Sequence, residues 1–146
     1  MIIDKFENEY AFLSNFYPSP VQENGVTYPT IEHYFQAQKT TVPFERAAIV
    51  NAATPGQAKR EGRRITLRKD WERVKDDVML QGLRLKFALP ELAEKLIATG
   101  DAELIEGTTW HDNIWGNCSC PQCEDIPGQN KLGKLLMKVR EEIKNR

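Results

Sequence analysis

The sequence contains only three cysteines, Cys118, Cys120 and Cys123, and all of them lie in the short segment CSCPQC. An odd number of cysteines without an export signal argues against a framework of disulfides. The first residues, MIIDKFENEY, lack the basic region and the long apolar run of a signal peptide. No other stretch is apolar for long enough to span a bilayer. We therefore expect a cytoplasmic protein that does not enter a membrane.

Excess charge of one sign is also missing, because 20 Lys and Arg face 21 Asp and Glu, for a formal net charge of −1. No field of the whole molecule would draw it to nucleic acid, so an anionic ligand needs a local group of basic side chains. The sequence has no Gly-rich phosphate loop and no alternation of strands and helices, which argues against a dinucleotide-binding fold. It also lacks internal repeats and linkers. The length of 146 residues predicts a single compact domain, residues 1–146.

Turn and helix signals predict a mainly α fold, of the α+β class, with a small β hairpin near the N-terminus. The hairpin is expected at Asn24-Gly25, which lies between short β-prone flanks. Thr30 has the position of an N-cap for a helix of about ten residues. A second N-cap, Thr54, is followed by Pro55 and by Gln57, which completes a capping box.

The second half of the chain predicts three further helices. Asp70 should cap the longest one, and Pro90 and Gly100 should bound the next. AELIE is a candidate for a short strand. The expected apolar stripes consist of Trp71, Val74, Val78 and Leu85 in the longest helix, and of Leu132, Leu135, Leu136, Val139 and Ile143 in the last one.

Glu32 lies in the first turn of the helix that Thr30 caps. The free N–H groups and the helix dipole stabilise negative charge there, so Glu32 should stay ionised at neutral pH. An ionised Glu suits a general base, a nucleophile or a partner for a developing cation. The alternative is a solvated Glu that only complements the dipole, and position alone favours this alternative. The neighbouring His33 is expected to be a structural histidine.

The segment TTWHDNIWG places Asp112 between Trp110 and Trp115. Two tryptophans this close in a loop are unusual. One interpretation is an aromatic wall that stacks a planar ring, with Asp112 at its edge. The other is that the tryptophans fill the core and that Asp112 caps a turn. Composition supports both interpretations equally.

The segment AKREGRR places Lys59 and Arg63 four residues apart on one helical face, and Gly62 permits a close approach. Two basic side chains in this arrangement can clamp a phosphate. A solvated basic face is the more common explanation of such a run.

The three cysteines have a spacing at which thiolates can bind zinc, with His111 or a distant residue as the fourth ligand. A structural zinc site usually shows two separated pairs of ligands, whereas this chain has one cluster. We therefore expect a reduced, partly buried loop and no metal.

The chain resembles the NADAR family of YbiA-like N-glycosidases. The matching segments run in family order over nearly the whole chain: FLSNFYP, YPTIEHYFQAQK, AKREGRR, LRKDWERVKDDVM, LKF, WHDNIWG and GQNKLGKLLMKVR. Together they are highly specific, although no single one would be. Many relatives have a Gly-rich stretch after WG, where this chain has NCSCPQC, so the wall of the pocket beyond Gly116 should differ.

The resemblance implies a mainly helical domain that hydrolyses the bond between C1 of a ribose and a nitrogen. Substrates in the family are ribosylamino-pyrimidine phosphates of early riboflavin synthesis and ADP-ribose attached to guanine in nucleic acid. Motif matching implies that Glu32 and Asp112 are catalytic and that Trp71 is a functional tryptophan. The substrate-binding residues that we expect are Asn15, Phe16, Lys59, Arg63, Trp71, Trp115 and Asn130.

The expected chemistry needs a carboxylate near a cationic, oxocarbenium-like sugar, and Glu32 is our candidate. Asp112 would activate water or protonate the leaving nitrogen, Trp71 or Trp115 would stack the base, and Lys59 and Arg63 would hold phosphate. We expect no cofactor and no obligate protein partner. The alternatives are a non-catalytic domain that binds ADP-ribose or a nucleotide, and a zinc-dependent interaction module built on the cysteines.

Overall fold

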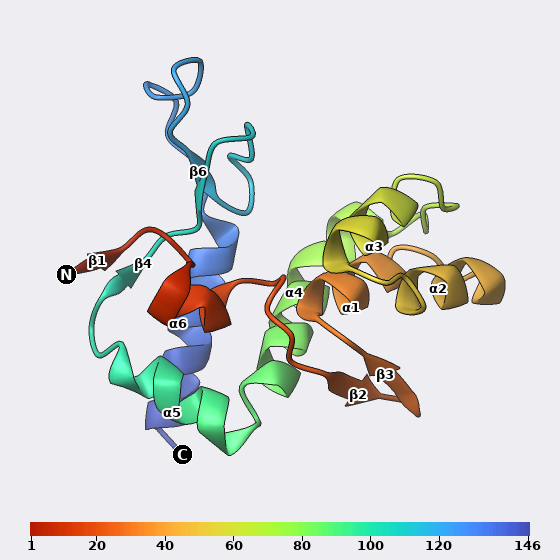
Figure 1. Cartoon of the computed structure of the whole chain (residues 1–146), viewed down its shortest axis with the longest axis horizontal. Helices are drawn as coiled ribbons and strands as arrows, with labels where there is room; N and C mark the ends of the chain where they lie inside the picture. The colour runs from red at the N-terminus through yellow and green to blue at the C-terminus, as the bar shows by residue number, and fades with distance from the viewer. The chain divides into compact units, whose positions relative to one another are not determined.

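Seven helices and six short strands make up the computed structural model, which describes all residues 1–146 (Figure 1). The helices are η1 (Asn8–Leu13, a 3-10 helix), α1 (Ile31–Ala37), α2 (Pro43–Val50), α3 (Pro55–Glu61), α4 (Trp71–Lys86), α5 (Pro90–Ala98) and α6 (Lys131–Lys144). The strands are β1 (Ile2–Ile3), β2 (Val21–Glu23), β3 (Val26–Tyr28), β4 (Glu103–Leu104), β5 (Gly107–Thr108) and β6 (Asn117–Cys118). The mainly helical fold with small β elements is as the sequence predicted.

The chain forms two compact units, which are described separately. One consists of residues 15–86, and the other combines residues 1–14 with residues 87–146. The predicted site residues Asn15, Phe16, Glu32, Lys59, Arg63 and Trp71 belong to the first unit, and Asp112, Trp115 and Asn130 belong to the second. No helix of the chain combines the length and the apolar character that crossing a membrane requires.

Helix α1 is the centre of the unit 15–86, because it packs against α2, α3, α4 and β3. All seven of its residues are buried, including the polar ones. The predicted N-cap is confirmed, since Oγ1 of Thr30 accepts a hydrogen bond from the backbone N–H of His33 at 3.1 Å. The helix ends at Ala37, earlier than predicted, and Arg46 from α2 then donates to the carbonyl groups of Ala37 and Thr40. These bonds satisfy carbonyls that the end of a helix leaves free.

The predicted hairpin is confirmed: β2 and β3 pair antiparallel, with Val21 opposite Tyr28. Asn24 and Gly25 at its turn both have positive φ, of 53° and 79°. A two-residue turn with this geometry favours Asn-Gly because glycine carries no Cβ and asparagine tolerates the left-handed region.

Hydrogen bonds connect the segment before α4 to the segment after α1. The guanidinium of Arg68 bonds to both carboxylate oxygens of Asp70, at 2.6 and 2.9 Å, and the backbone N–H of Arg68 donates to the carbonyl of Lys39. The helix begins at Trp71, as predicted, but Met79, Leu83 and Lys86 form its buried face with Trp71, and the other members of the predicted stripe are only half-buried.

In the second unit, β1 pairs with β4 and β5 pairs with β6, both in parallel. Helix α6 packs against α5 and β4. Gly100, predicted to end α5, has a φ of +63°, which glycine adopts without strain. The strand predicted in AELIE is confirmed as β4.

Candidate active site

Glu32 is buried in the first turn of α1, with 7% of its surface exposed. Its Oε1 accepts a hydrogen bond of 2.8 Å from Nε2 of Gln36, one turn further along the helix. Burial raises the pKa of Glu32, while the bond from Gln36 and the charges of Lys59 and Lys39 oppose that rise. The helix-dipole argument predicted an ionised carboxylate. Desolvation is the largest effect here, and it acts against the ionised form of Glu32.

Glu32, Lys39, Lys59 and Arg63 form one cluster of interacting charges. The charges of Lys59 and Lys39 both act on Glu32, and those of Lys59 and Arg63 both act on Lys39. The structure therefore brings the predicted pair Lys59 and Arg63 to the same place as Glu32. Three cations near one buried carboxyl leave an excess of positive charge, which suits a phosphate.

Lys39 is a further candidate that the sequence interpretation did not select as a site residue. Burial lowers the pKa of its amine, and the neighbouring cations Lys59 and Arg63 lower it further, whereas Glu32 acts in the opposite direction. Its position seven residues after Glu32, on the same helical face, was the available signal. A lysine that is desolvated and close to other cations can act as a base or a nucleophile.

Two buried oxygens in this unit have no hydrogen-bond partner: Oδ1 of Asn15 and Oε1 of Gln36. Both residues are hydrogen-bonded to Glu32. The backbone N–H of Glu32 donates to the backbone carbonyl of Asn15, and the carboxylate of Glu32 accepts from the side-chain amide of Gln36. An unpaired buried acceptor is unfavourable unless water or a ligand supplies a donor. These acceptors suit amino or hydroxyl groups of a ligand, which supports the prediction that Asn15 binds substrate.

Trp71 is 6% exposed and packs against Phe35, with ring centroids 5.0 Å apart. The amine of Lys39 lies 6.0 Å from the centroid of the Trp71 ring. This burial gives Trp71 a large packing role in addition to any contact with substrate. Phe16, the other predicted aromatic of the unit, is instead 44% exposed.

His33 is a structural histidine, as its position suggested. Nε2 lies 3.0 Å from the carbonyl of Ala52, so Nε2 carries a hydrogen, and Nδ1 lies 2.8 Å from the hydroxyl of Thr30. Both ring nitrogens are thus satisfied, which leaves the imidazole no free atom for chemistry.

Asp112 caps a turn in the second unit. Its Oδ1 accepts hydrogen bonds from the backbone N–H groups of Ile114 and Trp115, at 3.1 and 2.9 Å. Its Oδ2 makes no such bond and is the atom that can meet a substrate. The tryptophans of this segment do not fill the core, which was one of the two predicted interpretations. Trp110 is 56% exposed, and Trp115 is half-buried beneath the amine of Lys131.

Asn130, predicted to bind substrate, has its side-chain amide engaged by backbone. Oδ1 accepts from the N–H of Glu106 at 3.0 Å, and Nδ2 donates to the carbonyl of Leu104 at 2.9 Å. Its backbone is left-handed, with a φ of 49°, at the start of α6. These bonds favour a structural role that joins α6 to the segment after β4.

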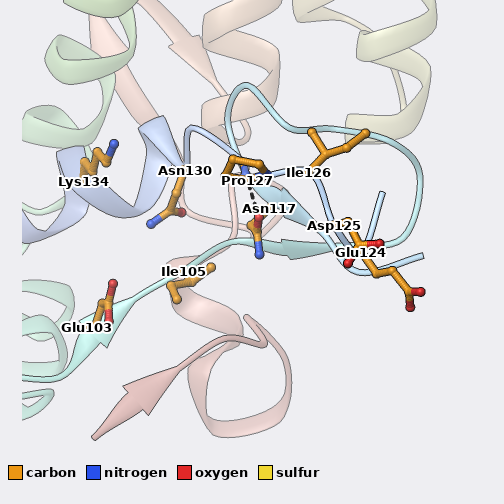
Figure 2. A pocket seen from close by; sticks show the side chains of 10 residues that line it. Glu103, Ile105, Asn117, Glu124, Asp125, Ile126, Pro127, Asn130 and Lys134 are labelled. Atoms are coloured by element: carbon orange, nitrogen blue, oxygen red, sulfur yellow. Dashed lines mark hydrogen bonds between the residues drawn. The ribbon is translucent and has the colours of Figure 1, made fainter. Parts of the chain in front are cut away.

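Each unit also carries a surface hollow that includes neither Glu32 nor Asp112. Figure 2 shows the one in the second unit, with a volume of about 520 Å³, where Asn117, Asn130 and Lys134 lie near the acidic side chains Glu103, Glu124 and Asp125. The hollow between α2 and α3 has a volume of about 380 Å³. Three carboxylates around the first hollow do not suit a phosphorylated ligand.

Comparisons with known proteins agree with the motifs. The family model for the NADAR domain matches residues 3–144. The N-glycosidase YbiA of Shigella flexneri serotype 5b is 42% identical over 139 residues, which cover 93% of this chain and 83% of that protein. The NMR structure of the Escherichia coli protein YbiA has a TM-score of 0.82 at 40% identity, and covers 99% of this chain and 86% of that one. The riboflavin biosynthesis protein VVA0006 of Vibrio vulnificus is 37% identical over 140 residues, which cover 94% of this chain and 36% of that longer protein.

Proposed function

Because this chain belongs to the NADAR family, we propose that its substrate is a ribosylamino-pyrimidine phosphate of early riboflavin synthesis, cleaved between C1 of the ribose and the nitrogen. Its relatives are N-glycosidases, so the chain is a hydrolase that acts on N-glycosyl bonds. The observation that carries the substrate proposal is the buried Glu32 among the cations Lys39, Lys59 and Arg63. The name of the Vibrio vulnificus relative, a riboflavin biosynthesis protein, supports the same substrate class.

The basic side chains would hold the phosphate of the ribose. Lys59 is half-buried and Arg63 is exposed, and they are separated by one turn at the end of α3. A phosphate bound to Lys59 would offset one of the positive charges that now lower the pKa of Glu32. Substrate binding would therefore raise the pKa of Glu32 further and keep its proton in place.

The protonated Glu32 would act as the general acid. It would pass its proton to the leaving nitrogen while the bond from that nitrogen to C1 breaks, and the bonding electrons would leave with the base. The carboxylate that remains would then stabilise the cationic sugar. This order of events differs from the role expected from the sequence, in which Glu32 was ionised from the start, and burial is the reason for the change.

Asp112 would activate the water that attacks C1. Two backbone N–H groups hold Oδ1, which fixes the orientation of the carboxyl group that would take the proton of that water. The half-buried Trp115 next to this turn would stack the base. Lys39 is a second candidate for attack on C1. Its neutral amine would displace the base, which leaves with the electrons of the C1–nitrogen bond, the sugar ring would open to give an imine, and water would then hydrolyse that imine.

An assay of released base and sugar phosphate tests the proposal. The full-length protein is incubated with a ribosylamino-pyrimidine phosphate, with the same compound lacking phosphate, and with ADP-ribosylated guanine in DNA. We expect the phosphorylated pyrimidine to react fastest. Faster release from ADP-ribosyl-guanine would overturn the substrate, and no release from any of them would favour a non-catalytic binding domain. Sodium borohydride, which reduces imines, should leave no sugar on the chain if water attacks directly, and a trapped adduct at Lys39 would assign the attack to its amine.

Variants connect the assay to the site. Glu32→Gln should lower turnover by about 100-fold or more, the scale of one lost charged catalytic group. Glu72→Gln, at an exposed position of α4, is the matched control and should keep full activity. Lys59→Ala should raise KM by about 10–100-fold through the loss of a charged hydrogen bond, whereas Arg64→Ala, an exposed residue that pairs with Glu61, should leave KM unchanged.

A further inference from the structure

The loop that begins after β5 and continues past β6 brings together one histidine and three cysteines. The donor atoms of His111, Cys118, Cys120 and Cys123 all lie within 4.8 Å of one another. We propose that these four side chains form a structural zinc site. Nothing in the hydrolytic chemistry of Glu32 and Asp112 uses this cluster.

The distances fit a tetrahedral metal. Zinc with bonds of about 2.3 Å to sulfur and 2.0 Å to nitrogen holds its donor atoms roughly 3.5–3.8 Å apart. Nδ1 of His111 lies 3.3 Å from Sγ of Cys120 and 3.3 Å from Sγ of Cys123. Small side-chain adjustments therefore suffice to admit the ion at the centre.

Hydrogen bonds alone do not account for the arrangement of His111. A neutral imidazole nitrogen carries either one hydrogen or one lone pair, yet Nδ1 faces two sulfurs at the same short distance. One ion between the three atoms accounts for both contacts. The backbone N–H of His111 also donates to Sγ of Cys118 at 3.3 Å, the kind of outer bond that supports a metal-bound ligand.

The backbone at His111 is unusual as well. Its φ of +67° lies in the left-handed region, which residues other than glycine rarely adopt. Such a conformation persists where surrounding contacts hold it. Coordination of the imidazole would supply that constraint.

The type of donors selects the metal and its role. Three thiolates and an imidazole suit zinc, whereas magnesium and calcium prefer oxygen. Cys118 and Cys123 are buried, Cys120 is half-buried and His111 is at the exposed edge. Four protein ligands leave no open position for water, so the site is structural.

The sequence interpretation favoured a reduced loop, because the cysteine segment lacked a clear fourth ligand. The structure supplies His111, the residue directly before Asp112, as that ligand. Asn113, the residue directly after Asp112, is held as well, because its Oδ1 accepts from the backbone N–H of Cys118 at 2.8 Å. The zinc would thus fix the turn of Asp112, a positioning role that rests on the proposed function.

The test uses the full-length protein, purified with a reducing agent and without chelator. Elemental analysis should find about one zinc per chain. A strong chelator should remove the metal and lower the melting temperature, since the free energy of metal binding contributes to folding. Refilling the stripped protein with Co²⁺ should give the intense absorption of thiolate-to-cobalt charge transfer together with the visible bands of a tetrahedral site.

Variants separate ligands from neighbours. Cys120→Ser and His111→Asn should each lose most of the zinc and the cobalt spectrum. Gln122→Ala changes an exposed residue of the same loop, and it should keep both the metal and the melting temperature of the original protein.

Several results would overturn the proposal. The first is that the purified protein contains no bound metal and that chelator does not change its melting temperature. The second is that two of the cysteines form a disulfide under reducing conditions. The third is that the protein contains stoichiometric iron in place of zinc. If a ligand variant does not fold, the metal content and cobalt spectrum of the unaltered chain still decide. None of these measurements uses the hydrolase assay, so the zinc site and the proposed substrate can fail independently.

Discussion

Replacing Gly62 by Ala should loosen the contact that holds Glu32. Gly62 follows α3 in a helical conformation, with a φ of −60°, so alanine meets no backbone strain there. Its Cβ would, however, lie 2.8 Å from Cδ of Gln36 and closer still to Oε1. Gln36 is buried and its own Cβ would be 3.3 Å away, so its amide has little space into which it can move. The displaced amide would lose its 2.8 Å bond to Oε1 of Glu32.

The magnitude follows from two opposing effects. Losing a hydrogen bond to an ionisable, buried partner costs about 1–3 kcal/mol. Removing the flexibility of glycine from the unfolded chain recovers about 0.4–1 kcal/mol. The net loss of about 1–2 kcal/mol should lower Tm by roughly 2–8 °C for a chain of this size.

The same change should alter catalysis through the pKa of Glu32. The bond from Gln36 lowers that pKa, so its loss moves the pKa further up. If Glu32 donates the proton, the alkaline limb of the pH–rate profile shifts to higher pH. Misplacement of the carboxyl by about 1 Å should also reduce kcat/KM by roughly 100-fold.

Gly56→Ala is the matched control for Gly62→Ala. Gly56 lies in α3 as well, and the nearest atom to its added Cβ would be Oγ1 of Thr54 at an ordinary 3.9 Å. Calorimetry should show Gly56→Ala equal to or slightly above the original protein in Tm, with an unchanged pH profile. If Gly62→Ala behaves in the same way, Gln36 does not clamp Glu32 as the structure indicates.

Three further variants test other parts of the site. Glu32→Gln should match the original protein in stability below pH 4.5, the ordinary pKa of a Glu. As pH rises through the raised pKa of Glu32, the variant should become more stable than the original, because the original must then ionise a buried group. A Tm difference between the two proteins that does not change with pH would contradict the raised pKa. Asp112→Asn keeps an oxygen to cap its turn, so it should fold normally, lose about 100-fold or more in turnover and change the pH–rate profile of the activity that remains; an unaltered profile would make Asp112 structural. Trp71→Ala should cost about 3–5 kcal/mol of stability through the cavity beside Phe35; a nearly unchanged Tm with a raised KM would assign the ring to the substrate instead.

Local signals in the sequence predicted those parts of the fold that local chemistry determines. The Asn24-Gly25 turn, the Thr30 cap and the stop at Gly100 each follow from one residue type at one backbone conformation. Helix α2 was missed, since Ile49 is its only buried residue and gives no apolar period. The buried face of α4 was misplaced because Lys86, 0% exposed, belongs to it. Periodicity does not assign a lysine to a core.

The sequence motifs selected residues of the candidate site, but they did not predict how deeply Glu32 is buried. Motifs indicated Glu32, Lys59 and Arg63, and the structure gathers them. The expectation of an ionised Glu32 rested on the helix dipole and the free N–H groups of the first turn, whereas all seven residues of α1 are buried and desolvation raises the pKa of Glu32. Burial depends on α2, α3 and α4 together, and no window of sequence around Glu32 contains that information. The grouping of His111 with the cysteines likewise depends on the pairing of β5 with β6.

The candidate site residues of this chain differ in whether their buried polar atoms are hydrogen-bonded. His33 was expected to be structural and Asn130 to bind substrate. In each of them both polar side-chain atoms are hydrogen-bonded within their own unit. Asn15 and Gln36 each keep one buried oxygen unpaired, and both are bonded to Glu32. Folding alone would have no reason to retain two unpaired acceptors next to a buried acid, because each is unfavourable without a donor. Water or a bound substrate with amino and hydroxyl groups can supply those donors, and the two unpaired acceptors beside Glu32 are therefore consistent with the proposed substrate site.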